Sequence, residues 1–98
     1  MKAVYKEPGK AARIVEIENS LQALQEAVGG YIETVTAFSD AAILCNEEGG
    51  LQGLPYNCTV IGVDFVGPVL AVGVDGCEMC GLSDEAADLL QRMLEGKA

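Results

Sequence analysis

The chain has 98 residues, of which half are apolar, and it carries a formal net charge of −9 and no histidine. This length suits one domain, residues 1–98, and the apolar share favours a packed core over a disordered chain. The lack of histidine removes the usual general base near neutral pH and most catalytic zinc sites. We therefore expect a protein that binds something, without enzymatic activity and without a cofactor.

The charge is distributed unevenly along the chain. Residues 1–13 carry four basic side chains against one acidic, whereas residues 14–98 carry two basic against fourteen acidic. Nucleic-acid binding normally needs a basic surface, so direct binding to nucleic acid is not expected. The uncharged apolar run at residues 65–74 is too short for a membrane span, and no apolar signal segment follows Met1. We expect a cytoplasmic protein with reduced cysteines and no membrane association.

A β-hairpin and a short helix are the first predicted elements. Strands at residues 3–5 and 12–18 flank a Pro-Gly turn, and Val and Ile alternate with Glu in the second strand. Asn19 is expected to cap a helix that ends at Gly29 and Gly30. Because this helix is too short to be stable alone, we expect it to lie on a sheet face.

The middle of the chain is rich in β-branched residues and predicts further strands. These are residues 31–38, 41–45, 59–65 and 69–74, and the last two are apolar enough to be central in a sheet. Residues 51–57 are predicted to be an irregular segment around a proline.

The last predicted element is a helix from about residue 84 to 95, capped by Ser83, with Arg92 and Lys97 near its negative end. One apolar stripe is expected along it: Ala86, Leu89, Leu90, Met93 and Leu94. Taken together, the elements predict an α+β fold, with a mainly antiparallel sheet of five or six strands and two helices.

Four short segments carry a resemblance to a known family. They read Val-Gly-Gly-Tyr-Ile-Glu at 28–33, Cys-Asn-Glu-Glu-Gly at 45–49, Gly-Leu-Pro-Tyr-Asn at 53–57 and Val-Gly-Pro-Val at 66–69. In this order they resemble domain-of-unknown-function family 3846, over roughly residues 2–94. The resemblance implies a small protein of phages, plasmids or other mobile elements, and such accessory proteins often antagonise host defence. It implies no established activity.

The candidate ligand-binding residues come from two places in the sequence. Polar side chains that hydrogen-bond or stack bracket the irregular segment, where binding groups often lie, although Asn also occurs in plain turns. The N-terminal hairpin holds the basic cluster, which suits a phosphate or carboxylate but is slightly more typical of an ordinary solvated hairpin. These candidates are Asn46, Tyr56, Asn57, Lys6, Lys10 and Arg13.

The four cysteines allow a metal site only as a weaker alternative. Cys77 and Cys80 form a Cys-x-x-Cys motif, and with Cys45 and Cys58 they would complete a four-thiolate zinc site. Cys45 and Cys58 do not form a second motif of this kind, so the spacing favours a structural role over zinc binding. The Cys-x-x-Cys motif is then a surface turn, and the other two thiols pack as small hydrophobes.

Two functions remain open at this point. The first is sequestration of a small signal molecule, such as a nucleotide, in a pocket. The second is an acidic decoy, similar to DNA mimics, that occupies a basic host protein. The small core also predicts self-association into a homo-oligomer.

Overall fold

The computed structural model describes residues 1–96, which contain two helices and eight strands. Lys97, expected near the end of the last helix, lies outside the described residues. In chain order the elements are β1 (Lys2–Lys6), β2 (Arg13–Glu16), α1 (Leu21–Val28), β3 (Ile32–Phe38), β4 (Ala41–Asn46), β5 (Tyr56–Val60), β6 (Val63–Val66), β7 (Val69–Asp75), β8 (Glu78–Cys80) and α2 (Asp84–Leu94).

The predicted α+β fold with a mainly antiparallel sheet is confirmed. The main sheet has the strand order β2-β1-β7-β4-β3, and the short β8 pairs with the end of β7. Within residues 1–96, strands β5 and β6 pair only with each other and form a separate hairpin. The interior strands are β1, β7 and β4, and of these β4 and β7 are almost fully buried. Their near-continuous apolar sequences fit burial on both faces.

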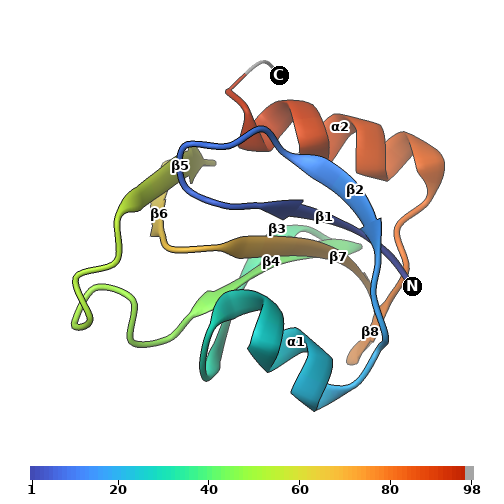
Figure 1. Cartoon of the computed structure of the whole chain (residues 1–98). Helices are drawn as coiled ribbons and strands as arrows, with labels where there is room; N and C mark the ends of the chain where they lie inside the picture. Colours follow the sequence, from blue (N-terminus) through green and yellow to red (C-terminus); the bar gives the residue numbers. More distant parts are fainter. Residues whose placement is uncertain (97–98) are drawn as a thin grey trace.

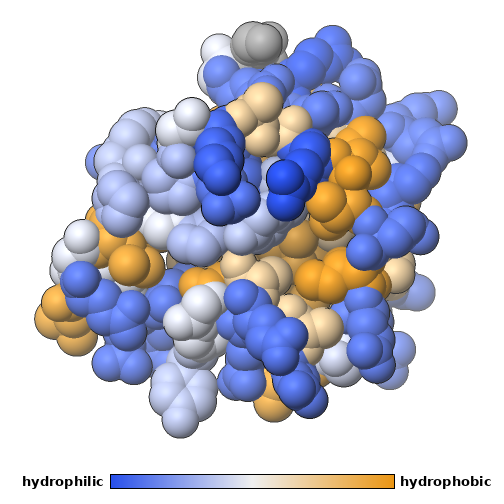
Figure 2. Space-filling view, in the orientation of Figure 1, coloured by the Kyte–Doolittle hydropathy of each residue, from blue (hydrophilic) through white to orange (hydrophobic). Residues whose placement is uncertain are grey.

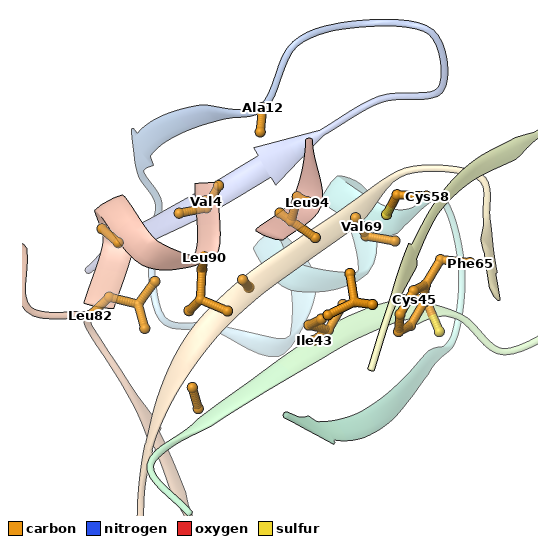
Figure 3. Close-up of a cluster of buried hydrophobic side chains, with 14 residues drawn as sticks. Val4, Ala12, Ile43, Cys45, Cys58, Phe65, Val69, Leu82, Leu90 and Leu94 are labelled. Carbon is orange, nitrogen blue, oxygen red and sulfur yellow. The ribbon is translucent and has the colours of Figure 1, made fainter. Parts of the chain in front are cut away.

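The main sheet is covered on both faces (Figure 1). Its residues alternate between two hydrophobic clusters. On β7, Val69 and Ala71 face one cluster, whereas Leu70 and Val72 face the other. Helix α1 covers the second of these faces. Helix α2 and the β5–β6 hairpin share the first, where Figure 3 shows the side chains of α2 and the hairpin meeting over the sheet.

The prediction of one central strand at residues 59–65 is wrong. The chain turns back between β5 and β6 at Ile61 and Gly62, whose φ angles are 51° and 73°. Two consecutive positive φ values are typical of a tight hairpin turn. Ile61 hides this turn in the sequence, because a β-branched residue favours an extended strand and rarely adopts positive φ.

The helix ends are largely as predicted, with one shift. Ser20 rather than Asn19 caps α1, accepting a hydrogen bond from the Ala23 amide at 3.2 Å. The Asn19 side chain instead donates to the Met79 carbonyl on β8 at 2.9 Å. Gly29 ends α1 with a left-handed φ of 81°, a conformation that favours glycine.

Helix α2 begins after the predicted cap, Ser83, but its buried face is rotated relative to the expected stripe. The fully buried side chains are Ala87, Leu90 and Leu94, whereas Leu89 is 40% exposed. Leu89 borders an apolar cavity of about 350 Å³ at the β3–β4 turn instead of packing in the core. The apolar pattern of the sequence does not by itself determine which part of the stripe packs against the sheet.

Hydrophilic side chains cover much of the molecular face seen in Figure 2, interrupted by hydrophobic patches. All fifteen acidic residues lie within the described chain, and all of them except Glu7 and Glu95 are exposed. Within residues 1–96, no helix combines the length and the apolar character that crossing a membrane requires.

Candidate functional site

A cavity of about 320 Å³ lies where β5 meets the ends of β1 and α2. We call it the Lys6 pocket. Its walls combine a buried basic group, an exposed aromatic ring, a thiol and the last turn of a helix. The lining residues are Lys6, Tyr56, Asn57, Cys58, Thr59, Leu94, Glu95 and Gly96.

The Lys6 ammonium is the buried charge of this pocket. The residue is only 8% exposed, although lysine is almost never fully buried without a partner. Its Nζ donates to Asn57 Oδ1 at 2.8 Å, and more weakly to the carbonyls of Asn57 at 3.3 Å and Glu7 at 3.5 Å. None of the ion pairs formed among residues 1–96 involves Lys6. The positive charge is therefore solvated by neutral oxygens.

Asn57 is the extra residue of a β-bulge and holds three elements together. The β5–β6 register shifts between Tyr56 and Cys58, which leaves Asn57 without a cross-strand partner. Its side chain points inward, accepts from Lys6 Nζ, and donates to the carbonyls of Lys6 at 2.8 Å and Gly67 at 2.7 Å. The amide group thus ties the hairpin to β1 and to the turn before β7.

Tyr56 stands at the rim of the pocket and is 59% exposed. Its hydroxyl is 2.7 Å from Thr59 Oγ1, and Thr59 Oγ1 in turn donates to Asp64 Oδ1 at 2.6 Å. The ring is therefore anchored at its polar end and leaves an aromatic surface available for a ligand.

The remaining walls come from α2 and from the hydrophobic core. Glu95 Oε2 accepts a hydrogen bond from the Ala12 amide at 3.0 Å, so the helix end is fixed to the N-terminal hairpin. Burial raises the pKa of the Cys58 thiol, and the positive charge of Lys6 opposes that rise. The protonated thiol is therefore a weak nucleophile in this pocket. An ammonium beside an aromatic ring suits the binding of an anionic, ring-bearing ligand better than covalent chemistry.

The structure brings together three of the six predicted ligand-binding residues, Lys6, Tyr56 and Asn57. Asn46 does not line this pocket; it is buried at the end of β4, where its amide donates to the Val28 carbonyl and its Oδ1 accepts from the Glu48 amide. Asn46 therefore holds the end of α1 against the following turn, a structural role.

Lys10 and Arg13 also lie outside the lining of the Lys6 pocket. Both are exposed and both approach the Glu7 carboxylate, at 3.7 Å and 4.0 Å. Arg13 also lies over the Tyr5 ring, 5.4 Å from its centre. Their positive charge is thus partly offset within the hairpin.

No local sequence pattern points to Thr59, Asp64, Leu94 or Glu95 as binding residues. Thr59 and Asp64 appeared to belong to one continuous strand, and the α2 residues approach β5 only through the tertiary fold. A larger cavity of about 480 Å³ lies between α1, β3 and β8, but none of the residues described along its walls is a buried polar one.

A protein-family model described as Domain of unknown function (DUF3846) matches residues 1–95. The chain belongs to this family. The match confirms the resemblance of the four short segments, two of which contribute the ends of β4 and β5. No curated protein and no solved structure matches the chain.

In this DUF3846 protein the four cysteines do not assemble into the zinc site considered as an alternative. Cys45 and Cys58 are buried in the hydrophobic cluster beneath α2 and the hairpin (Figure 3), whereas Cys77, just before β8 in the chain, is exposed. Among residues 1–96, no three Cys, Asp or Glu side chains are grouped so that they would hold a metal ion. Burial also raises the pKa of Cys45 to about 11, which disfavours the thiolate that zinc requires.

Proposed function

We propose that the chain is a non-enzymatic binding protein that sequesters a small anionic molecule, such as a nucleotide, in the Lys6 pocket. In the mobile-element setting that the family resemblance implies, the bound molecule would be a signal of host defence. The protein would act in the cytoplasm by lowering the free concentration of that signal.

The observation that carries this proposal is the buried Lys6 ammonium without an ionic partner among residues 1–96. A charge removed from water is costly unless hydrogen bonds and an opposite charge compensate it. Here the hydrogen bonds are present, but two of the three are long, at 3.3 Å and 3.5 Å. An oxygen of an anionic ligand would replace these two weak contacts and supply the missing negative charge.

The dimensions and walls of the pocket support a small ligand over a macromolecule. Its volume of about 320 Å³ falls at the lower end of the range of roughly 300–1,000 Å³ for small-molecule sites. The exposed Tyr56 ring would contact a planar group, while the net charge of −9 disfavours a polyanion.

A thermal-shift screen of nucleotides, cyclic dinucleotides and inorganic phosphate tests the proposal. A ligand present at 100 times its Kd stabilises the fold by about 2.7 kcal/mol, which gives a measurable rise in Tm. We expect at least one anionic, ring-bearing compound to raise the Tm at physiological salt. A flat response across the whole panel would contradict the proposal.

The acidic decoy is the second candidate, favoured by the exposure of thirteen of the fifteen acidic residues, all except Glu7 and Glu95. Salt separates the two functions. Screening acts within about 10 Å at 0.1 M salt, so a decoy held by exposed charges would lose its basic partner steeply as salt rises. Binding in a pocket that encloses the ligand would change much less. A basic protein bound only at low salt, with no small ligand, would favour the decoy.

Self-association is part of the same proposal. A single chain has a Cα radius of gyration of 12.0 Å, close to the roughly 13 Å expected for a compact monomer of this length. If the chain forms homo-oligomers, small-angle scattering will give a distinctly larger radius that rises with protein concentration. A radius that stays at the single-chain value at high concentration would exclude the oligomer.

A further inference from the structure

The β-bulge at Asn57 determines which side chains share the outer face of the hairpin. In a regular strand, residues three apart point to opposite faces. The extra residue in β5 shifts the alternation, so that Asn57 and Cys58 are both buried while Tyr56 and Thr59 are both exposed. Asp64 lies directly across from Thr59 on β6. The bulge therefore places Tyr56, Thr59 and Asp64 in one row beside the Lys6 pocket.

The hydrogen bonds along this row have a defined direction. A carboxylate only accepts hydrogen bonds, so the single hydroxyl proton of Thr59 goes to Asp64 Oδ1, at 2.6 Å. Thr59 Oγ1 then accepts from the Tyr56 hydroxyl, 2.7 Å away. The phenol proton is used inside the protein, and the Tyr56 ring is anchored through it. What remains for a ligand is the ring face and an acceptor oxygen.

We propose that Thr59 and Asp64 are positioning residues that hold the Tyr56 ring as a stacking surface, so that the Lys6 pocket selects anions carried on a planar ring. This inference rests on the proposed function and narrows its ligand class. Lys6 contributes to the binding of any small anion. Tyr56 adds affinity only when the ligand has an aromatic ring, and only while the row keeps the side chain in place.

The bulge residue Asn57 connects the buried lysine to the position of the Tyr56 ring. Lys6 Nζ holds Asn57 Oδ1 at 2.8 Å, and Asn57 is the residue that creates the bulge. The group that attracts the anion is thus also part of the framework that turns Tyr56 outward. An exposed tyrosine on an unsupported strand would sample several rotamers and lose entropy on binding, whereas an anchored ring loses less.

The test compares adenosine monophosphate with ribose phosphate, which carries the same anionic group without the base. Calorimetric titrations are made with the natural chain, Thr59→Val, Thr59→Ser and the matched control Thr36→Val. Valine keeps the shape of threonine but cannot pass on the hydrogen bond, whereas serine can. Thr36 is an exposed strand threonine that does not line the pocket.

We expect the natural chain to bind adenosine monophosphate more tightly than ribose phosphate, by about tenfold, as one stacked base contributes. Thr59→Val should lose most of this advantage, with a much smaller change in its affinity for ribose phosphate. Thr59→Ser should retain the preference for adenosine monophosphate, and Thr36→Val should leave both affinities unchanged. An equal loss of affinity for both ligands in Thr59→Val, or no loss for either, would contradict the positioning role. The proposal that the Lys6 pocket binds an anion would still stand.

A measurement on the free protein keeps the two proposals separate. NMR should show the Tyr56 ring in steady contact with residue 59 in the natural chain and in Thr59→Ser, but not in Thr59→Val. A freely rotating ring in the natural chain would overturn the positioning role even if nucleotides bind. If neither probe binds the natural chain, the anion pocket itself is wrong, and the ligand selectivity argued from it falls too.

Discussion

The two faces of the main sheet are closed in different ways. On one face, α1 packs against β4 and β7, and the buried core there is apolar apart from Asn46, which holds the end of α1. On the other face, α2 and the β5–β6 hairpin share the surface, and the seam between them contains Lys6 and Asn57. A single helix leaves no such seam. Where two elements meet, backbone groups must find partners, and that requirement places buried polar side chains beside a cavity.

Under the proposed function, this difference separates residues that only stabilise the fold from residues that also bind the ligand. The α1 face is a conventional helix-on-sheet core, so changes there should reduce stability without touching ligand selectivity. The polar seam on the α2 face should show both effects, because Lys6 and Asn57 hold the hairpin in place and also line the pocket. Mutations on the two faces therefore provide a direct comparison.

The largest loss of stability is expected from Leu44→Ala on the α1 face. Leu44 is fully buried in β4, and its truncation leaves a cavity that the rigid sheet cannot fill. Removing such a side chain costs about 4 kcal/mol of unfolding free energy, measured by urea denaturation. Ligand affinity below the Tm should be unchanged. A similar loss of affinity in this variant would show that the two faces are not independent.

Asn57→Leu should cost slightly less stability but abolish binding. The substitution keeps the side-chain volume approximately but leaves the buried Lys6 ammonium and the carbonyls of Lys6 and Gly67 without their partner. We expect a loss of about 3 kcal/mol in urea denaturation, together with loss of the ligand-induced Tm shift. A loss below about 1 kcal/mol would mean that the seam is readily solvated.

A smaller effect should appear at alkaline pH and arise from the α2 face. Burial raises the pKa of Cys45 to about 11 and also raises that of Cys58, whereas an unfolded thiol ionises near its ordinary value of 9.0. Between these values the folded chain binds more protons than the unfolded chain, so stability falls as pH rises from about 9 to about 11. The decline should be shallower in Cys45→Ala. An identical decline in both proteins would contradict this assignment.

The α1 face and the interior strands were predictable from sequence, because they depend on local patterns. Continuous apolar runs identified β4 and β7, and the paired glycines identified the end of α1. The three-residue β8 was missed, since Glu78, Met79 and Cys80 form no periodic pattern long enough to recognise.

The polar seam was only partly predictable, because it depends on tertiary contacts and on one irregular residue. Lys6, Tyr56 and Asn57 were selected for their chemistry, but nothing local indicates that Lys6 and Asn57 pair across 51 residues of sequence. Asn46 has the same chemistry as Asn57 and was selected for the same reason, yet it stabilises a turn. The bulge at Asn57 has no distinct sequence signal, and without it the row of Tyr56, Thr59 and Asp64 cannot be inferred.

The most direct test of the central claim is calorimetric titration of adenosine monophosphate and inorganic phosphate into the natural chain, Lys6→Met and Lys10→Met. Both substitutions remove one positive charge from the same hairpin, but only Lys6 is buried in the pocket. The account predicts that Lys6→Met remains folded and loses at least about tenfold in affinity for both ligands, whereas Lys10→Met stays within about twofold. Unchanged binding in Lys6→Met, or equal loss in both variants, would contradict it.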